Sequence, residues 1–163
     1  MSGLEIRAAR PDEYAAVGEL CVAAYARAHG VSEGYAATLR DVAGRAADAE
    51  VLVAVDDGRP AGTVTLIADG GRSHEIAGPD EAEFRFLAVD PDAQRGGIAS
   101  ALVRRCAEEA AALGRARLVC SSGDWMPGAH ALYARLGFTR VPARDWRPRA
   151  DLPLLVFSLR LDR

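Results

Sequence analysis

One segment of this 163-residue chain constrains its fold more than any other: between Val89 and Ser100 a strand runs into a glycine turn and then directly into a helix. The segment reads Val-Asp-Pro-Asp-Ala-Gln-Arg-Gly-Gly-Ile-Ala-Ser. The first N–H groups of a helix have no partners inside the helix and lie at the positive end of its dipole. Glycine lets the backbone approach a phosphate without an intervening side chain. The segment therefore predicts an anion site, with pyrophosphate as its natural ligand.

Two common nucleotide-binding motifs do not fit this turn. Gly-x-Gly-x-x-Gly and Gly-x-x-x-x-Gly-Lys-Ser/Thr both fail on spacing. The second motif also needs a lysine, whereas all twenty basic residues of the chain are arginine. NAD and ATP are therefore not favoured as ligands, and lysine chemistry such as Schiff-base catalysis is excluded.

The turn has a closer match elsewhere. Gln94-x-x-Gly97-x-Ala99 resembles the Gln/Arg-x-x-Gly-x-Gly/Ala motif of the GNAT superfamily of acyl-CoA-dependent N-acyltransferases. About thirty residues later, the segment Ala129–Phe138 resembles the family's Ala-x-x-Leu-Tyr-x-x-Leu-Gly-Phe pattern. Two independent motifs in the family's order make a chance match improbable. The resemblance is strong from 83 to 141 and looser over the first eighty residues, and it implies one GNAT N-acetyltransferase domain over residues 1–163.

Hydrophobic periodicity predicts where the elements lie. We expect strands at 4–7, 51–55, 61–67, 82–89, 116–120, 138–141 and 152–161, and helices at 11–29, 32–42, 98–113 and 128–136. A glycine- and proline-rich mobile loop is expected over 69–80, and a polar, arginine-rich loop before the last strand. The resemblance implies that these elements form an α/β (α+β) fold with a mixed, mostly antiparallel central sheet of about seven strands and about four helices.

Composition excludes several classes of protein. The cysteines, Cys21, Cys106 and Cys120, are odd in number and far apart, so no disulfide framework or metal site is indicated and a cytoplasmic location is expected. The chain has no apolar run long enough for a membrane span and no apolar signal-peptide core. A net charge of −3 argues against a general nucleic-acid binder.

The resemblance implies acetyl-CoA as co-substrate, with no metal. Its pyrophosphate would lie on the turn formed by Gln94, Arg95, Gly96, Gly97, Ile98, Ala99 and Ser100. In the strand before the turn, the family pattern puts Leu87 near the acetyl group and Val89 beside the pantetheine. Acetyl is the default acyl group, because chain-length preference depends on a pocket depth that spacing does not give.

Acyl transfer to an amine needs a neutral nucleophile, a polarised carbonyl and a proton for the departing thiolate. Tyr133 matches the family's tyrosine and is the predicted acid, since a phenol has a pKa near 10. Glu83 is the side-chain candidate for the base, because period-two alternation would put Glu83, Arg85 and Leu87 on one face. The alternative is that Glu83 pairs with Arg85 and that water deprotonates the amine. His130 is expected at the surface or at the cofactor's edge.

One position departs from the family pattern. Seven residues before Tyr133, where many relatives have asparagine, this chain has Met126, so a pantetheine contact made by that asparagine is in doubt. Trp125 and Met126 form either an apolar wall beside the cofactor or a cover over the core. A non-catalytic acyl-CoA-binding module or sensor is therefore the alternative to an enzyme that acetylates amines by direct attack in a ternary complex.

The acceptor is expected to be the primary amine of a small molecule or peptide of unspecified identity. In the family, the first two helices and the loop before the last strand form the acceptor pocket. Here they offer Tyr25, His29 and Tyr35 on one side and the segment 144–147 on the other. An arginine cluster in this region either binds a carboxylate or phosphate of the acceptor or is solvated; its members are Arg140, Arg144, Arg147 and Arg149. A homodimer through an exposed edge strand is compatible with such a sheet, although no residue specifies it.

Overall fold

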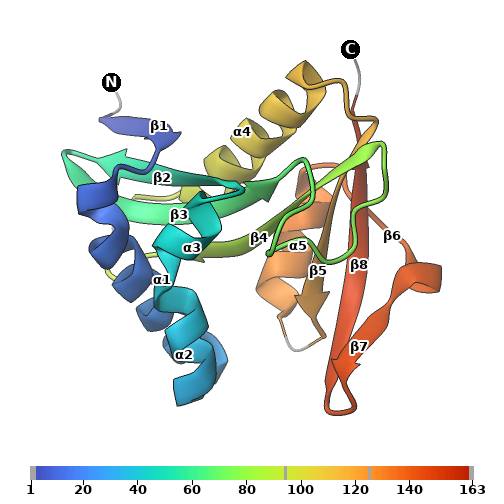
Figure 1. The fold of residues 1–163 in the computed structure, drawn as a ribbon, viewed down its shortest axis with the longest axis horizontal. Coiled ribbons are helices and arrows are strands. Elements are labelled where there is room, and N and C mark those ends of the chain that lie inside the picture. The colour runs from blue at the N-terminus through green and yellow to red at the C-terminus, as the bar shows by residue number, and fades with distance from the viewer. Residues whose placement is uncertain (1–2, 94, 125, 162–163) are drawn as a thin grey trace.

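The computed structural model describes residues 3–93, 95–124 and 126–161, and the chain there folds around one sheet (Figure 1). The strands are β1 (Leu4–Ala8), β2 (Glu50–Asp56), β3 (Arg59–Ile67), β4 (Glu81–Val89), β5 (Arg117–Gly123), β6 (Thr139–Arg140), β7 (Trp146–Arg149) and β8 (Leu152–Arg160). The helices are α1 (Tyr14–His29), α2 (Glu33–Arg40), α3 (Val42–Ala46), α4 (Ile98–Ala112) and α5 (Pro127–Arg135). Short 3-10 turns cover Pro11–Glu13 and Pro142–Arg144.

The strand order confirms the mixed, mostly antiparallel sheet. It runs β1-β2-β3-β4-β5-β8-β6, with β7 paired to β8. Every pair is antiparallel except β4 and β5, which are parallel and are joined by the crossover helix α4. The parallel pair therefore sits in the middle of the sheet, between two antiparallel halves.

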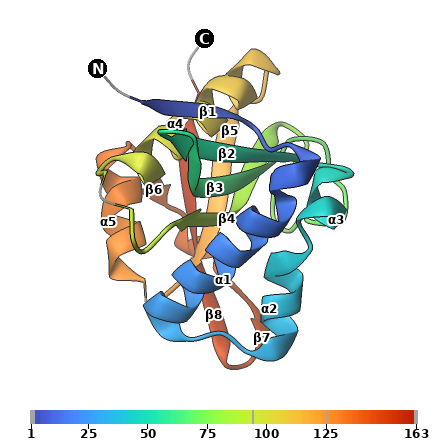
Figure 2. The same cartoon turned by 90° about the vertical axis from the view of Figure 1, so that its left-hand side faces the viewer.

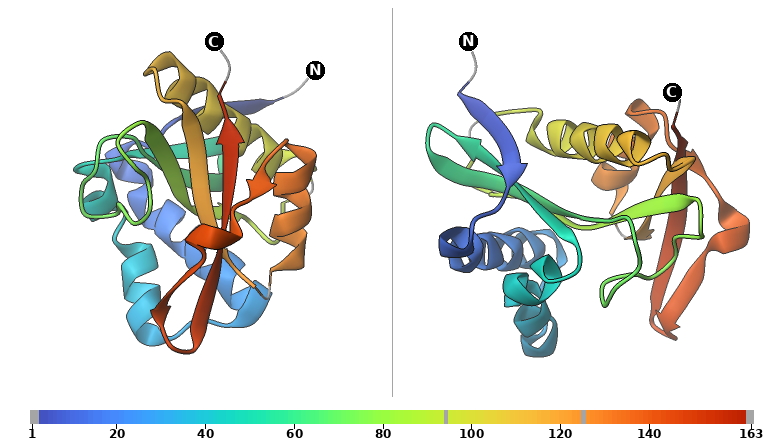
Figure 3. Two further views of the ribbon diagram at one scale, coloured as in Figure 1. Left: turned by 90° about the vertical axis from the view of Figure 1, so that its right-hand side faces the viewer. Right: turned by 45° about the horizontal axis from the view of Figure 1, so that its top comes forward.

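Helices cover both faces of the sheet. Figures 2 and 3 show α1, α2 and α3 on one face and α4 and α5 on the other. The larger core lies under α4 and α5, where Leu102, Cys106 and Ala110 of α4 pack at helical spacing against the strands. On the opposite face, Val17 and Val42 pack on β2. Each fully buried aliphatic side chain of this kind contributes roughly 1.5–3 kcal/mol.

Close packing of α4 on β3 depends on one glycine. A Cβ added at Gly62 would lie 2.7 Å from Ile98 Cγ2 and 3.2 Å from the carbonyl oxygen of Ala88. A side chain at this position would collide with Ile98 and crowd the Ala88 carbonyl, so Gly62 lets the start of α4 lie directly on β3 beside the end of β4. The N-terminal end of the helix is thereby fixed to the sheet.

Two segments differ from the sequence prediction. The expected helix over 32–42 breaks at Asp41, whose side chain accepts the Gly44 N–H at 3.0 Å and begins α3 as a separate helix. The arginine-rich segment predicted as a loop contains β7, with Trp146 opposite Leu154 on β8. Both differences have the same cause. The segments around Asp41 and β7 are locally polar, so hydrophobic periodicity did not indicate a new helix at the first or a hairpin strand at the second.

Candidate active site

The parallel strands β4 and β5 separate part-way along their length. They pair only from Glu81 to Glu83 on β4 and from Arg117 to Val119 on β5. Beyond these residues no pairing joins the facing edges of 84–89 and 120–123 in the described part of the chain, and Figure 1 shows the two strands diverging. Backbone N–H and C=O groups at such an opening need partners. We call this opening between 84–89 and 120–123 the wedge. It offers main-chain hydrogen bonds to an extended ligand.

A β-bulge in β4 shapes one wall of the wedge. Phe86 has a positive φ of 59°, and the register with β3 shifts between Thr63 and Thr65. The extra residue reverses the alternation of side chains. Leu87 and Val89 consequently pack on the α4 side, whereas Phe86 packs on the α1 side.

This bulge corrects the sequence-based prediction that Glu83, Arg85 and Leu87 share a face. The prediction assumed an unbroken period of two. Leu87 instead lies on the face where Val89 and α4 lie. Leu87 and Val89, which were predicted to lie beside the cofactor, are thus on the face of the sheet that α4 covers, and the glycine turn leads into this helix.

The glycine turn has the geometry of an anion site. Gly97 is the N-cap of α4 with a φ of 81°, a conformation that favours glycine. The first bond of the helix runs from Ala101 N to the Gly97 carbonyl, so the N–H groups of Ile98, Ala99 and Ser100 have no partners within the helix. A Cβ at Gly96 or Gly97 would meet nothing within 4 Å. Amides at a helix start without partners inside the helix, next to glycines that leave room for a ligand, are the donor set that a phosphate requires.

Two other predicted residues of the turn have different outcomes. Arg95 lies 3.5 Å from Asp56 in an ion pair, so its charge is shared with the β2–β3 hairpin. Gln94 falls outside the described residues, and its predicted contact with the cofactor stays a prediction.

Tyr133 of α5 reaches the core under the wedge. It is 5% exposed, and its ring contacts Phe84, Phe138 and Phe157 with centroids 5.3–5.8 Å apart. The side chain interacts with that of Cys120, on the β5 wall of the wedge. Burial raises the pKa of Tyr133 well above its usual value, so the phenol keeps its proton. The structure therefore places a neutral hydroxyl donor next to β5.

His130 and Met126 are both engaged at the start of α5. The His130 Nε2 lies 3.0 Å from the Gly123 carbonyl, and its ring stacks near Phe157 at 5.1 Å. The sulfur of Met126 accepts the Ser122 hydroxyl at 3.8 Å. His130 thus holds the end of β5 and is a poor proton shuttle, while Met126 lies against β5 at the wedge. Trp125 falls outside the described residues.

Glu83 is built into the β3–β4 loop. Its side chain is 1% exposed, and Oε1 accepts the backbone N–H groups of Glu75, Ile76 and Ala77 at 2.8, 3.1 and 3.2 Å. The suggested partner Arg85 instead pairs with Glu75 at 3.2 Å. This geometry favours a structural role for Glu83, because three loop amides hold one oxygen of its buried carboxylate in place.

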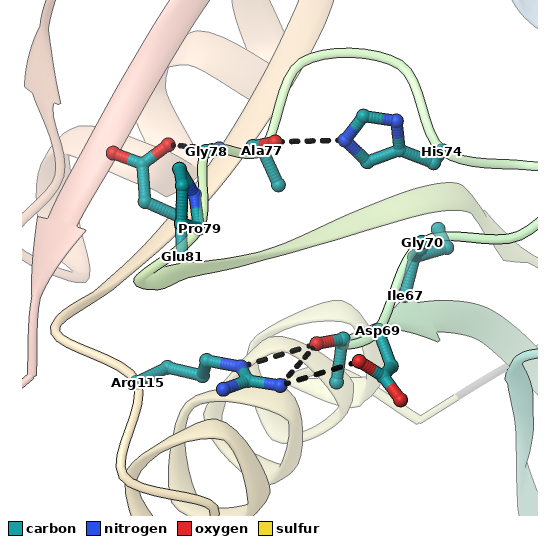
Figure 4. Close-up of a pocket in the computed structure, with 10 residues that line it drawn as sticks. Ile67, Asp69, Gly70, His74, Ala77, Gly78, Pro79, Glu81 and Arg115 are labelled. Atoms are coloured by element: carbon teal, nitrogen blue, oxygen red, sulfur yellow. Dashed lines mark hydrogen bonds and ion pairs between the residues drawn. The ribbon is translucent and has the colours of Figure 1, made fainter.

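The loop over 69–80 encloses a cavity of about 290 Å3 (Figure 4). Glu81 and Arg115 line it, and these residues lie where β4 and β5 begin. Figure 4 shows Arg115 bonded to Ala68 and Asp69, and His74 bonded to the Ala77 carbonyl. The cavity is therefore at the paired end of the two strands, away from the wedge.

The residues expected to line the acceptor pocket lie on two walls, one formed by α1 and α2 and the other by the segment around β7. On the first, Tyr25 and Tyr35 lie with ring centroids 5.9 Å apart, and Tyr35 is 36% exposed. The side chain of His29 falls outside what the structure describes. On the second wall, a cavity of about 520 Å3 is lined by Asp124, Asp145, Trp146, Arg147, Pro153, Leu154 and Leu155. Of the two carboxylates in this cavity, Asp145 is paired with Arg140, whereas Asp124 has no ion pair among the described residues. An aromatic ring and an unpaired carboxylate in one cavity suit an amine-bearing ligand.

Most of the predicted arginine cluster is already occupied. Arg144 is bonded to both oxygens of Glu81 and to the Ile76 carbonyl, and Arg140 forms a bidentate pair with Asp145. Arg147 gives one hydrogen bond, to the Ala150 carbonyl at 2.8 Å. Arg149 forms one exposed ion pair, with Asp151 at 3.4 Å. Of the candidates for binding an acceptor anion, Arg147 and Arg149 therefore keep the most donors available.

Comparison with known proteins agrees with this geometry. The profile of the acetyltransferase (GNAT) family matches residues 14–138, which span the wedge, the glycine turn and α5. The chain belongs to the GNAT acetyltransferase family. Members of this family carry out acetyl-CoA-dependent acetyl transfer. No curated protein matches the sequence significantly.

Solved structures show the same GNAT fold. An acetyltransferase of the family from Staphylococcus aureus Mu50 superposes with a TM-score of 0.77 at 12% identity over 98% of this chain and 99% of the other. A Salmonella typhimurium protein solved with its cofactor acetyl-CoA gives 0.66 at 22% identity, over 99% and 95%. The Escherichia coli ribosomal-protein-S18-alanine N-acetyltransferase gives 0.68 at 22% identity, over 98% and 95%. These likenesses establish the fold.

Two negative observations hold for the described residues of this GNAT chain. None of their helices has the length and apolar character of a membrane span. They contain no group of three or more His, Cys, Asp and Glu side chains suited to a metal ion.

Sequence reasoning also missed Cys120 as the partner of Tyr133 and Arg45 as a buried cation, because each contact depends on tertiary packing.

Proposed function

We propose that this protein transfers an acetyl group from acetyl-CoA to a primary amine of a small molecule or peptide, by direct attack in a ternary complex. The observation that carries the proposal is the wedge between β4 and β5, whose unpaired edges lead toward the free amides that begin α4. Main-chain groups in the wedge suit the amides of pantetheine, and the helix start suits a pyrophosphate. The residues present therefore fit acetyl-CoA.

Each cofactor-binding residue has a proposed role. The amides from Gly96 to Ser100 receive the pyrophosphate, and Arg95 adds charge at its edge. The Val89 backbone would bond the pantetheine, and the Leu87 N–H would donate to the thioester carbonyl. A donor fixed at that oxygen stabilises the negative charge that develops there during attack.

Tyr133 is the proposed acid, because burial keeps its proton in place and Cys120 is its partner when no ligand competes. We propose that water takes the proton of the attacking amine, since Glu83 is committed to three amides. The side chain of Glu83 is 1% exposed and three loop amides fix Oε1, so the carboxylate is anchored to the loop and is not free to move toward an amine.

The absence of a free side-chain base at Glu83 also supports the second candidate, an acyl-CoA-binding module without efficient turnover. The buried hydroxyl of Tyr133 favours the enzyme. The two are separated by turnover: thiol release that depends on an added amine identifies an enzyme, and tight acetyl-CoA binding without transfer to any amine identifies the module.

We also propose a cytoplasmic location, because the three cysteines are free and buried. The first test is thermal unfolding with acetyl-CoA, NAD or ATP. A ligand that binds only the folded state at about 100 times its dissociation constant stabilises it by roughly 2.7 kcal/mol. A shift with acetyl-CoA alone supports the cofactor and leads to an amine screen with thiol release as readout. No shift with acetyl-CoA would overturn the proposal.

A further inference from the structure

The bulge residue Phe86 lies between two arginines from different parts of the chain. Its ring centroid is 4.3 Å from the guanidinium carbon of Arg45 and 4.4 Å from that of Arg85. The ring is buried, and its backbone has a φ of 59°. A bulky residue in this conformation is strained and persists only where its surroundings hold it. Leu20, Cys21 and Leu39 belong to the same apolar cluster as the ring, and the two cations lie over the ring itself.

Arg45 ties Phe86 to the helices of the acceptor side. Its side chain is 4% exposed, and its Nη atoms donate to the carbonyls of Thr38 and Leu39 at 2.8 and 3.1 Å, at the end of α2. Its Nε is buried without a hydrogen-bond partner among the described residues. Burial lowers the pKa of Arg45. A buried cation with incomplete hydrogen bonding depends on the aromatic ring for part of its stabilisation.

Arg85 ties Phe86 to the β3–β4 loop. It donates to the Ser73 carbonyl at 3.0 Å and forms an ion pair with Glu75 at 3.2 Å. Glu75 also donates its backbone N–H to Glu83. The loop over 69–80 and the α2–α3 corner thus both reach the same ring, one through each arginine.

We propose that Arg45 and Arg85 are positioning residues that clamp Phe86 in its left-handed conformation and so set the cofactor wall of the wedge. Without the clamp, the backbone at Phe86 relaxes toward an ordinary strand, and a change of one residue in register turns Leu87 to the opposite face. Acetyl-CoA binding is therefore coupled to the acceptor-side elements that hold the arginines. The inference rests on the proposed function only in naming acetyl-CoA as the ligand.

The test compares Arg45→Met and Arg85→Met with Arg40→Met. Arg40 ends α2 and pairs with Glu19 at 2.7 Å on the surface, so it is a matched control for the loss of an arginine. We expect the dissociation constant for acetyl-CoA, measured by calorimetry, to rise about tenfold in Arg45→Met and Arg85→Met and to stay unchanged in Arg40→Met. Hydrogen exchange of the 84–89 amides should quicken in the first two variants alone.

Equal dissociation constants and equal exchange in all three variants would overturn the proposal. So would weaker binding without faster exchange at 84–89, because the loss would then not run through Phe86. If Arg45→Met does not fold, Arg85→Met decides, since that side chain is 22% exposed. If the unmodified protein does not bind acetyl-CoA, the proposed function fails, and the exchange measurement still tests the clamp.

A second background separates positioning from general support. Glycine adopts a positive φ without strain. In Phe86→Gly, therefore, Arg45→Met should bring no further rise in the acetyl-CoA dissociation constant. An equal rise in both backgrounds would mean that Arg45 only holds α2 and α3 together, and would overturn its positioning role.

Discussion

The Oε1 atom of Glu83 lies 2.8 Å from the backbone nitrogen of Glu75, and the amides of the next two residues bind the same oxygen. One carboxylate therefore organises the turn of a twelve-residue connection, 69–80, that has neither helix nor strand. Hydrogen bonds to an ionised acceptor are stronger than neutral ones. Glu83 thus acts as an internal anchor for the loop that carries Glu75 to Arg85.

Replacing this anchor should lower stability without changing how activity depends on pH. Glu83→Gln keeps the shape and loses the charge, so we expect the free energy of unfolding to fall by about 1–3 kcal/mol. Urea unfolding measures this, with Glu108→Gln as control, because Glu108 is exposed. A loss of the acidic limb from the pH profile of acetyl transfer, with stability kept, would instead identify Glu83 as the base.

The two ends of α4 allow a matched test of the glycine turn. Gly97 before the helix and Gly114 after it have φ values of 81° and 79°, and a Cβ at either meets nothing within 4 Å. Alanine at each position should cost about 1–2 kcal/mol of stability, because a left-handed conformation is unfavourable for alanine. Acetyl-CoA affinity should fall only in Gly97→Ala. Equal affinity in both variants, by calorimetry, would remove the pyrophosphate from this helix end.

Tyr133 can be separated from its packing role by removing one atom. Tyr133→Phe keeps the ring contacts with Phe84 and Phe157, so stability should change by no more than about 1 kcal/mol. If the hydroxyl protonates the leaving thiolate, kcat should fall about 100-fold while the KM for acetyl-CoA stays similar. Cys120→Ala is the control, because it removes the hydroxyl's partner and should retain activity. Unchanged kcat in Tyr133→Phe would exclude this acid.

The sequence predicted those parts of the site that depend on local pattern. The turn from 90 to 97 and the helix after it follow from glycine placement and helix periodicity, and the confirmed mixed sheet follows from strand spacing and the family resemblance. Tyr133 could be singled out because it lies inside a contiguous motif, and its role as the acid stays a prediction. Its burial against Cys120 could not be predicted, because that contact joins α5 to β5.

The remaining features depend on tertiary structure. Period-two alternation failed at Phe86, since a bulge made by a non-glycine residue leaves no sign in the sequence. Nothing in the sequence distinguishes the buried Arg45 from the other arginines, because only the fold shows the ring of Phe86 next to it. The three hydrogen bonds that Glu83 Oε1 accepts could not be predicted either, since the donating amides come from a loop without periodicity.

Acid should destabilise the protein through Glu81. Burial alone would raise the pKa of Glu81, but hydrogen bonds from Arg144, from the Gly78 amide and from Arg117 outweigh it and lower the pKa to about 2. The folded state thus favours the charged form relative to the unfolded chain, where the pKa is near 4.5. The stabilisation is complete above pH 4.5 and is lost as the pH falls toward 2.

Glu81→Gln should therefore make the protein less stable at neutral pH and make its loss of stability between pH 4.5 and 2 shallower. Part of the slope should remain, because Arg7 also holds the pKa of Glu13 at about 2. Urea midpoints measured across this range test the expectation, again with Glu108→Gln as control. An acid slope equal to that of the unmodified protein would mean that the contacts of Glu81 with Arg117 and Arg144 do not persist in solution, and the link between the β3–β4 loop and the start of β7 would lose its support.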